Sequence, residues 1–122
     1  MLSVRNQIIT MNRGDTVTLP MFINKGSKVA PERYVLGEGD TVYLGIMEFG
    51  QPFECALIRK ACTSADLDAD GDVVFTLEPK DTEFVHPGEY YYEVKLVHAY
   101  QELGREPFVD TICPRRKFIV LE

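Results

Sequence analysis

The 122-residue sequence contains no tryptophan, only two histidines and no long uninterrupted apolar stretch. A membrane-spanning helix needs about 18 or more consecutive apolar residues, so no membrane segment is expected. The first residues lack the basic-then-apolar order of a signal peptide. The 13 basic side chains are outnumbered by 19 acidic ones, and the resulting net charge of −6 opposes binding to nucleic-acid phosphates. We therefore expect a soluble protein that binds neither membrane nor nucleic acid.

Cysteine is also scarce, and Cys55, Cys62 and Cys113 form no Cys-x-x-Cys pair of the kind that holds zinc or a redox centre. An odd number leaves at least one thiol unbridged within the chain, which fits a protein made inside a cell. A bridge from Cys55 to Cys62 would join the ends of one expected strand, about 23 Å apart at about 3.3 Å per residue. We expect all three to be small apolar residues in strands.

Apolar side chains alternate with period two through most of the chain, whereas no window of about 11 residues has the spacing of an amphipathic helix. This pattern predicts an all-β fold. The clearest strand, Thr16–Ile23, places Val17, Leu19 and Met21 on one face. Because Pro20 lacks an amide proton, we expect this strand to lie at a sheet edge or to carry a bulge there.

A second long alternation, Thr41–Phe49, is apolar on both faces and is expected to be central in its sheet. No linker divides the chain, so residues 1–122 are expected to form one β-sandwich domain of seven to eight strands. The other strands are expected between turns rich in Gly, Pro, Asn and Asp, at Val4–Ile9, Glu54–Ala61, Asp72–Glu78, Glu89–His98, Pro107–Ile112 and Lys117–Leu121.

The segment LEPKDTEFVHPGEYYYEVKL, residues 77–96, indicates which sandwich this is. In immunoglobulin-like domains a tyrosine near the start of the sixth strand hydrogen-bonds to the upstream backbone, and Tyr90 stands at that position. Tyr92 follows where antibody domains place a disulfide cysteine, and we expect it to pack inward. The prediction is therefore an immunoglobulin-like antiparallel β-sandwich whose sheets are held together by apolar burial.

The acidic run Asp66-Leu-Asp68-Ala-Asp70-Gly71 matches the first half of a calcium-binding loop, with carboxylates at positions 1, 3 and 5. The match then fails, because position 12 should supply a bidentate carboxylate and is Leu77. We interpret the run as a solvated acidic turn, with Asp66, Asp68 and Asp70 as the candidate ligands if a metal binds.

The tripeptide Arg13-Gly14-Asp15 is read by integrins when it lies on a loop tip. However, Gly14-Asp15-Thr16 recurs as Gly39-Asp40-Thr41, each time ahead of an apolar strand. The repeat indicates that glycine supplies an unusual backbone angle and that the aspartate binds nearby amides. We favour this structural interpretation.

Residues arranged for catalysis are missing from the sequence. His86 and His98 have no ligand spacing, and we expect both at the surface. No Gly-x-Ser-x-Gly motif surrounds a serine, so we expect neither an enzyme nor a cofactor. Carboxylates could pair in space as in glycosidases, but on an acidic chain we expect them to face solvent, at Glu48, Glu54, Asp81 and Asp110.

Large outward-facing side chains offer a different kind of site, because clustered exposed aromatic residues mark partner surfaces. The basic cluster Arg115-Arg116-Lys117 is either a docking site for an acidic partner or a charged edge that discourages strand addition. We favour the second interpretation. If the alternation holds, the candidate interaction residues are Tyr43, Met47, Phe49 and Tyr91.

The order of four segments along the chain carries a resemblance to a known family. The segments are RGDTVTLPMFIN, GDTVYLGIMEFG, VVFTLEPKDTEFVHPGEYYYEVKLV and DTICPRRKFIVLE. Together they resemble the immunoglobulin-like domain of tailed-phage and prophage tail modules, as found at the start of baseplate upper proteins of phages that infect Gram-positive bacteria. The resemblance covers about the whole chain and implies structural roles for Asp81, Gly88, Tyr90 and Tyr92. The matching elements fall at Gly14–Thr16, Gly39–Asp40, Leu77–Thr82, Gly88–Glu93 and Thr111–Phe118.

The resemblance implies a non-enzymatic virion structural or accessory protein, associated with a tail or baseplate and made in the bacterial host cytoplasm. Its partners would be other phage structural proteins, and a homo-oligomer is compatible with this role. Baseplate proteins continue into receptor-binding or carrier segments, whereas this sequence ends at Glu122, so receptor binding is not implied. The alternative is a carbohydrate-binding or cell-surface binding module in which Tyr43 or Tyr91 stacks on a sugar.

Overall fold

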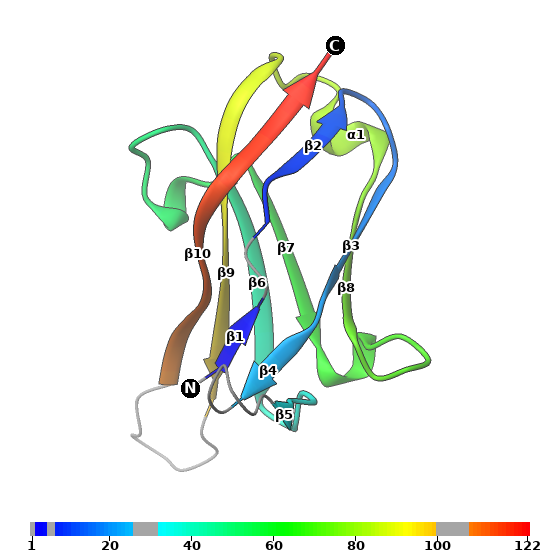
Figure 1. The fold of residues 1–122 in the computed structure, drawn as a ribbon, viewed down its shortest axis with the longest axis vertical. Coiled ribbons are helices and arrows are strands. Elements are labelled where there is room, and N and C mark those ends of the chain that lie inside the picture. The colour runs from blue at the N-terminus through cyan, green and yellow to red at the C-terminus, as the bar shows by residue number, and fades with distance from the viewer. Residues whose placement is uncertain (1, 5–6, 26–31, 100–107) are drawn as a thin grey trace.

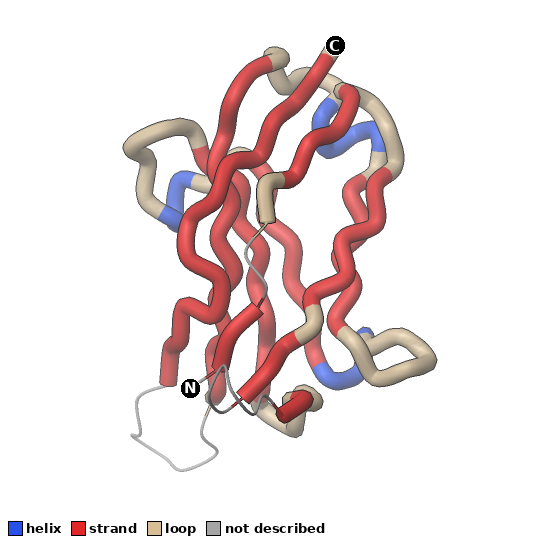
Figure 2. The backbone as a smooth tube through the Cα atoms, in the orientation of Figure 1, coloured by secondary structure: helices blue, strands red, loops and turns tan. Residues whose placement is uncertain are grey.

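A computed structural model of the protein describes residues 2–4, 7–25, 32–99 and 108–122. Strands dominate this part of the chain (Figure 2). The all-β prediction is confirmed. No helix among the described residues is long and apolar enough to cross a membrane.

Ten strands and three short helical turns follow one another along the described residues. The turns are η1 (Phe53–Cys55), η2 (Ser64–Asp66) and α1 (Pro79–Thr82). The strands are β1 (Leu2–Val4), β2 (Ile9–Asn12), β3 (Val17–Met21), β4 (Ile23–Lys25), β5 (Glu32–Arg33), β6 (Asp40–Met47), β7 (Ile58–Thr63), β8 (Val73–Leu77), β9 (Gly88–His98) and β10 (Phe108–Leu121).

The strands form three sheets. The largest has the order β2-β10-β9-β6-β7, and β3 pairs with β8, while β1, β4 and β5 form a small sheet in that order. Strand β2 runs parallel to β10, and the other pairs are antiparallel. In Figure 1 the five-stranded sheet lies on the left and β3 with β8 on the right, and the core fills the space between them.

Alternation along the strands builds this core, as the sequence predicts. Leu19 and Met21 of β3 are buried, and β6 lies between β9 and β7 with Val42, Leu44 and Ile46 buried. Strand β3 has β8 as its one described neighbour, so the prediction of an edge strand around Pro20 is also confirmed.

Three predicted strands are interrupted in the structure. Thr16–Ile23 is not one strand, because β3 ends at Met21 and Ile23 begins β4, which belongs to the small sheet. Val4–Ile9 is not one strand: β1 belongs to the small sheet and β2 to the five-stranded sheet, and residues 5–6 between them lie outside the described residues. Glu54–Ala61 is also not one strand. Its first residues form η1, which starts directly after Pro52, and β7 begins only at Ile58.

A fourth difference concerns the end of the chain. Pro107–Ile112 and Lys117–Leu121 were expected as separate strands, but the chain from Phe108 to Leu121 forms the single strand β10. Its register against β9 shifts twice, between Thr111 and Cys113 and between Cys113 and Arg116. These bulges accommodate Pro114, which has no amide proton to donate, without ending the strand.

The cysteines are all free thiols. Cys62 and Cys113 are buried in β7 and β10, and burial is the main cause that raises the pKa of both thiols. The expectation was wrong for Cys55, which is exposed in η1 because the segment around it is a helical turn rather than a strand.

Two tyrosines near the start of β9, Tyr90 and Tyr92, bond through their hydroxyl groups to the backbone of other segments. The Tyr90 hydroxyl donates to the carbonyl oxygen of His86 at 2.5 Å, an upstream backbone bond of the expected kind. Tyr92 is 2% exposed, and its hydroxyl donates to the carbonyl oxygen of Gln7 and accepts from the Gln7 amide at 3.1 Å. Burial raises the pKa of Tyr92 to about 12, so the hydroxyl keeps its proton for this bond.

A pocket of about 170 Å³, partly open to solvent, is lined by Tyr92 of β9 and by residues of β2 and β3. Most of its surface is apolar. Its lining residues are Gln7, Ile9, Leu19, Pro20, Met21 and Tyr92.

Tyr92→Ala is expected to lower the free energy of unfolding by about 3–5 kcal/mol, the usual cost of removing a buried aromatic ring. Tyr92→Phe keeps the ring and removes the hydroxyl, with its bonds to Gln7 and its contact with the Cys113 thiol, so a loss of about 1–2 kcal/mol is expected. Urea denaturation followed by circular dichroism measures both losses. Equal losses in the two variants, or an alanine variant as stable as the native chain, would contradict a core role for the ring.

Candidate interaction surface

The loop of residues 48–57, between β6 and β7, folds over the outer face of the five-stranded sheet, the face that points away from β3 and β8 (Figure 1). The loop can lie close to the sheet because β6 has a glycine there. A Cβ added at Gly45 would lie 2.6 Å from the ring of Phe53, so any larger residue would collide with it. The sequence thus places a small residue where an aromatic ring covers the strand.

Two cations hold the Phe53 ring in place. The Arg59 guanidinium lies 5.5 Å from the ring centroid and the Lys95 ammonium 5.0 Å from it. Arg59 also donates to the Phe53 carbonyl oxygen at 3.1 Å. Contacts of this type contribute about 0.5–1 kcal/mol each at exposed sites, so together they fix the loop on the sheet.

Beyond Phe53 the loop presents apolar side chains to solvent. The Phe49 ring is 81% exposed, and its centroid lies 5.8 Å from that of Tyr91 with the planes tilted by 53°. Leu57, at the other end of the loop, is 51% exposed. Phe49, Tyr91 and Leu57 form the apolar centre of what we call the loop face.

The four predicted interaction residues are not all available on this face. Phe49 is exposed, and Tyr43 and Tyr91 are half-buried. The prediction for Met47 is wrong, because its side chain is fully buried outside the main core. The loop returns beside it, where the Leu57 amide donates to the carbonyl oxygen of Ile46 at 2.8 Å.

Charged side chains border this apolar centre on β9 and β10. Glu93 is largely buried and accepts from the Arg115 guanidinium at 3.0 Å, with the Lys95 ammonium 3.5 Å away. Farther along the strands, the Lys117 ammonium lies 3.7 Å from the Glu89 carboxylate. The loop face therefore combines an apolar centre with a polar rim, the composition of a protein interface.

The basic cluster lies on the part of β10 that precedes its pairing with β2. That pairing begins at Phe118, and among the described residues the preceding part of β10 pairs with β9 alone. Charge, Pro114 and two bulges therefore coincide on a stretch of β10 that pairs with β9 alone among the described strands, although β10 also contacts β1 without pairing with it. This agrees with the interpretation of Arg115-Arg116-Lys117 as protection against strand addition.

Gly45→Ala is expected to displace the Phe53 ring, to lower the free energy of unfolding by about 1–3 kcal/mol and to speed chymotrypsin cleavage in residues 48–57. The same substitution in a Phe53→Ala background should cost much less, because the ring with which the methyl group collides is gone. A double-mutant cycle by urea denaturation measures this coupling. Equal costs in both backgrounds would contradict the packing of the loop on β6.

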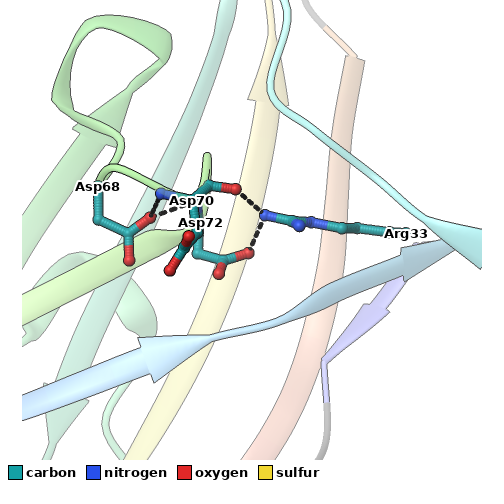
Figure 3. A network of polar contacts seen from close by, with 4 residues as sticks. All are labelled: Arg33, Asp68, Asp70 and Asp72. Carbon is teal, nitrogen blue, oxygen red and sulfur yellow. Dashed lines mark hydrogen bonds and ion pairs between the residues drawn. The ribbon is translucent and has the colours of Figure 1, made fainter.

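The acidic run was interpreted as a solvated turn, with Asp66, Asp68 and Asp70 as the candidate ligands if a metal binds. The structure groups Asp72 with Asp68 and Asp70 and leaves Asp66 out (Figure 3). One carboxylate oxygen from each of these three residues lies within 4.8 Å of the others. Asp66 is excluded from the group because it caps η2, where it accepts hydrogen bonds from the amide and hydroxyl of Thr63.

The group is already engaged by protein donors. Asp68 accepts from the amides of Asp70 and Asp72 at 3.0 and 2.8 Å. Arg33 approaches from β5 and bonds to the Asp70 carbonyl oxygen and, at 2.5 Å, to the Asp72 carboxylate (Figure 3). The Arg33 guanidinium thus neutralises part of the negative charge, and we interpret the group as an acidic turn stabilised by these hydrogen bonds.

The two Gly-Asp-Thr joints share their glycine geometry but not their aspartate contacts. Gly14 and Gly39 have φ of 82° and 88°, as the structural interpretation requires. The Asp40 carboxylate accepts from the Gly37 amide at 3.0 Å, whereas Asp15 is exposed and no bond of its carboxylate is seen among the described residues. The Gly14 amide donates instead to the hydroxyl of Thr82 at 2.8 Å.

Asp40, the first residue of β6, is the most buried carboxylate among the described residues, and its side chain is 2% exposed. It accepts from the Tyr34 hydroxyl at 2.5 Å and contacts Nδ1 of His98. His98 lies at the surface as expected, with 36% of its side chain exposed, and β9 pairs it with Asp40. Burial alone raises the pKa of Asp40, but the bonds from Tyr34, His98 and Gly37 outweigh it and leave the pKa below its usual 3.8.

Asp81 braces α1 rather than joining a carboxylate pair. It accepts from the Glu78 amide at 2.7 Å and lies 2.9 Å from the Lys60 ammonium. Burial raises the pKa of Asp81, but the bonds from Lys60 and the Glu78 amide lower it by a larger amount, so the pKa lies below its usual value.

Replacing Asp40 with asparagine should destabilise the fold by about 1–3 kcal/mol at neutral pH, because charged hydrogen bonds are lost. The folded pKa is depressed, so the contribution of Asp40 is complete above the unfolded pKa of 3.8 and is lost as pH falls through the lower folded value. Urea denaturation between pH 7 and pH 3 should show the difference between the native chain and Asp40→Asn shrink on acidification. A difference that is constant or grows toward pH 3 would contradict this assignment.

Comparison with known proteins adds no relative to this picture. No protein-family model, curated protein or solved structure matches the chain. Function must therefore be inferred from the residues and contacts above. Of these, the loop face is the feature whose exposed side chains have the chemistry of a binding surface. Sequence reasoning missed Phe53 and Leu57 in it, although Gly50 and Pro52 mark a loop rather than a strand at that point.

Proposed function

We propose that this protein is a non-enzymatic structural or accessory protein of a phage or prophage virion, associated with the tail or baseplate, that acts through contacts with other phage structural proteins. The observation that carries the binding part of this proposal is the exposed Phe49 ring, which packs at a tilt against Tyr91, in a loop that also exposes Leu57. An aromatic side chain covers 150–250 Å² when buried and is a typical anchor of a protein interface.

The phage assignment draws its support from the order of sequence motifs along the chain. The strand order is compatible with the same kind of domain. In variable-type immunoglobulin domains the last strand, the sixth strand and the central strands C and C′ lie side by side, and β10, β9, β6 and β7 follow this order. The bond from Tyr90 to the His86 carbonyl oxygen is a further point of agreement.

The placement of the loop face favours a contact that is formed once and kept. Phe53 and its two cations hold the loop against the sheet, so little conformational entropy is lost when a partner covers Phe49. A surface of this kind suits a component built into a particle.

The decisive variant is Phe49→Ala, with Phe84→Ala as its matched control. Both phenylalanines are highly exposed, at 81% and 87%, but Phe84 follows α1 and belongs to a different loop. We expect the Phe49 variant to bind co-expressed tail proteins about 30-fold less tightly, the effect of losing an anchor residue, while both variants keep the native melting temperature. Co-purification and titration with the tail proteins of the encoding phage or prophage measure the difference.

Equal binding by the two variants, or absence of the protein from purified tails of that phage, would contradict the proposal. A glycan array provides the comparison with the carbohydrate-binding alternative. Saturable glycan binding that depends on Tyr91 or Tyr43, without binding to tail proteins, would replace the proposed function by that alternative.

A further inference from the structure

A second exposed apolar surface lies on the outer side of β3 and β8, away from the five-stranded sheet (Figure 1). Pro20 and Val74 are register partners whose neighbours along the strands are buried in the core, so both side chains point outward. Phe22, directly after β3, and Val35, shortly after β5, are 59% and 52% exposed. We call the surface formed by Pro20, Phe22, Val35 and Val74 the Phe22 face.

The strand registers bring Phe22 and Val35 together. The Tyr34 amide donates to the carbonyl oxygen of Ile23 at 2.9 Å, which extends the antiparallel register of β4 with β5 by one pair. One further step along this register sets Phe22 opposite Val35. The register of β3 with β8, continued past its last pair, sets Phe22 opposite Asp72. Phe22 therefore lies between an apolar residue and a carboxylate.

Negative charge borders the Phe22 face. Val35 lies beside the acidic turn of residues 68–72, because its Cγ1 atom is 4.0 Å from the position that a Cβ would take at Gly71. The turn gathers three aspartate carboxylates, and Arg33 is the one cation among the described residues that bonds to it. Three carboxylates against one guanidinium leave this surface with an excess of negative charge.

The loop face carries charge of the opposite sign beside its aromatic centre. Lys117 is the register partner of Tyr91, and it ends the basic cluster Arg115-Arg116-Lys117. Two further cations lie over the Phe53 ring. The carboxylates around this surface are Glu48, Glu54, Glu89 and Glu93, of which the last is largely buried. Cations therefore exceed exposed carboxylates around the loop face, although the chain carries a net charge of −6.

The two faces are complementary in charge, and each has a phenylalanine at its apolar centre. Opposite charge across an interface fixes its register and speeds the encounter of the partners. The faces point in opposite directions from the core, so a copy that binds its neighbour through one face keeps the other face free. A head-to-tail contact of this kind joins successive copies into a ring or a filament, whereas a two-fold contact ends at a dimer.

We propose that the loop face of one copy of this chain binds the Phe22 face of a second copy, with the basic cluster set against the acidic turn. This inference rests on the proposed function, because it names a second copy as one of the structural proteins that bind the loop face. Each copy contributes Phe49 to one contact and Phe22 to the next.

Sedimentation velocity of the full chain tests this contact. The matched control is Phe84→Ala, because Phe84 is also highly exposed but belongs to neither face. We expect the native chain and the control to form species larger than a dimer at concentrations below about 1 mM. Phe22→Ala and Phe49→Ala should each raise the dissociation constant about 30-fold, since each loses an aromatic anchor. Raising the salt concentration from about 0.05 M to about 0.5 M should also weaken native association.

An equal mixture of the two weakened variants separates a head-to-tail contact from a two-fold one. The loop face is intact in Phe22→Ala, and the Phe22 face is intact in Phe49→Ala. One native contact can therefore form between the two variants, and the mixture should give dimers of native affinity and nothing larger. Both substitutions are at exposed positions, so the melting temperatures should remain native.

Four results would overturn the inference: a native chain that stays monomeric at about 1 mM, native association that ends at dimers, Phe22→Ala association as tight as the native one, or a mixture that forms no dimers. The proposed function has a separate readout. If self-association failed and Phe49→Ala still bound tail proteins less tightly than the native chain, the inference would be wrong and the proposed function would stand.

Discussion

The bonds between the Tyr92 hydroxyl and the backbone of Gln7 hold the N-terminal segment against β9, and the arrangement of the two layers depends on this contact. Gln7 lies between β1 of the small sheet and β2 of the five-stranded sheet, where β2 runs parallel to β10. With all three cysteines free, apolar burial around the Tyr92 ring is what joins the layers. A partly open pocket of about 170 Å³ lies beside the ring at this junction.

Much of the fold follows from side-chain alternation alone, because a strand with one buried face must repeat every second residue. The strands around Leu19, Leu44, Phe75 and Val94 were predicted for this reason. Alternation does not report where the backbone changes sheet or bulges. Strand β10 continues past Pro114 because bulges absorb the missing donor, and such local irregularity depends on the register of the neighbouring strand.

The loop face could be predicted in part. Exposure of Phe49 follows from its position at the end of β6, but burial of Met47 depends on a loop that returns from a distance along the sequence. Likewise, carboxylate spacing predicted an acidic turn, but it did not show that Asp72 belongs to the carboxylate group and that Asp66 does not. The difference depends on the capping of η2 by Asp66 and on the bond from Arg33, which lies in another sheet, to Asp72. A rigid core thus supports a loop whose exposed residues are free for a partner, which is the physical basis of the proposed role in assembly.

The account stands on the junction between the N-terminal segment and the five-stranded sheet, and backbone nuclear Overhauser effects between β2 and β10 test it most directly. The predicted result is a parallel register, with Ile9 close to Phe118 and Asn12 close to Leu121. Contacts of Ile9 with Leu121, as in an antiparallel pair, or no contact between the two strands, would contradict it.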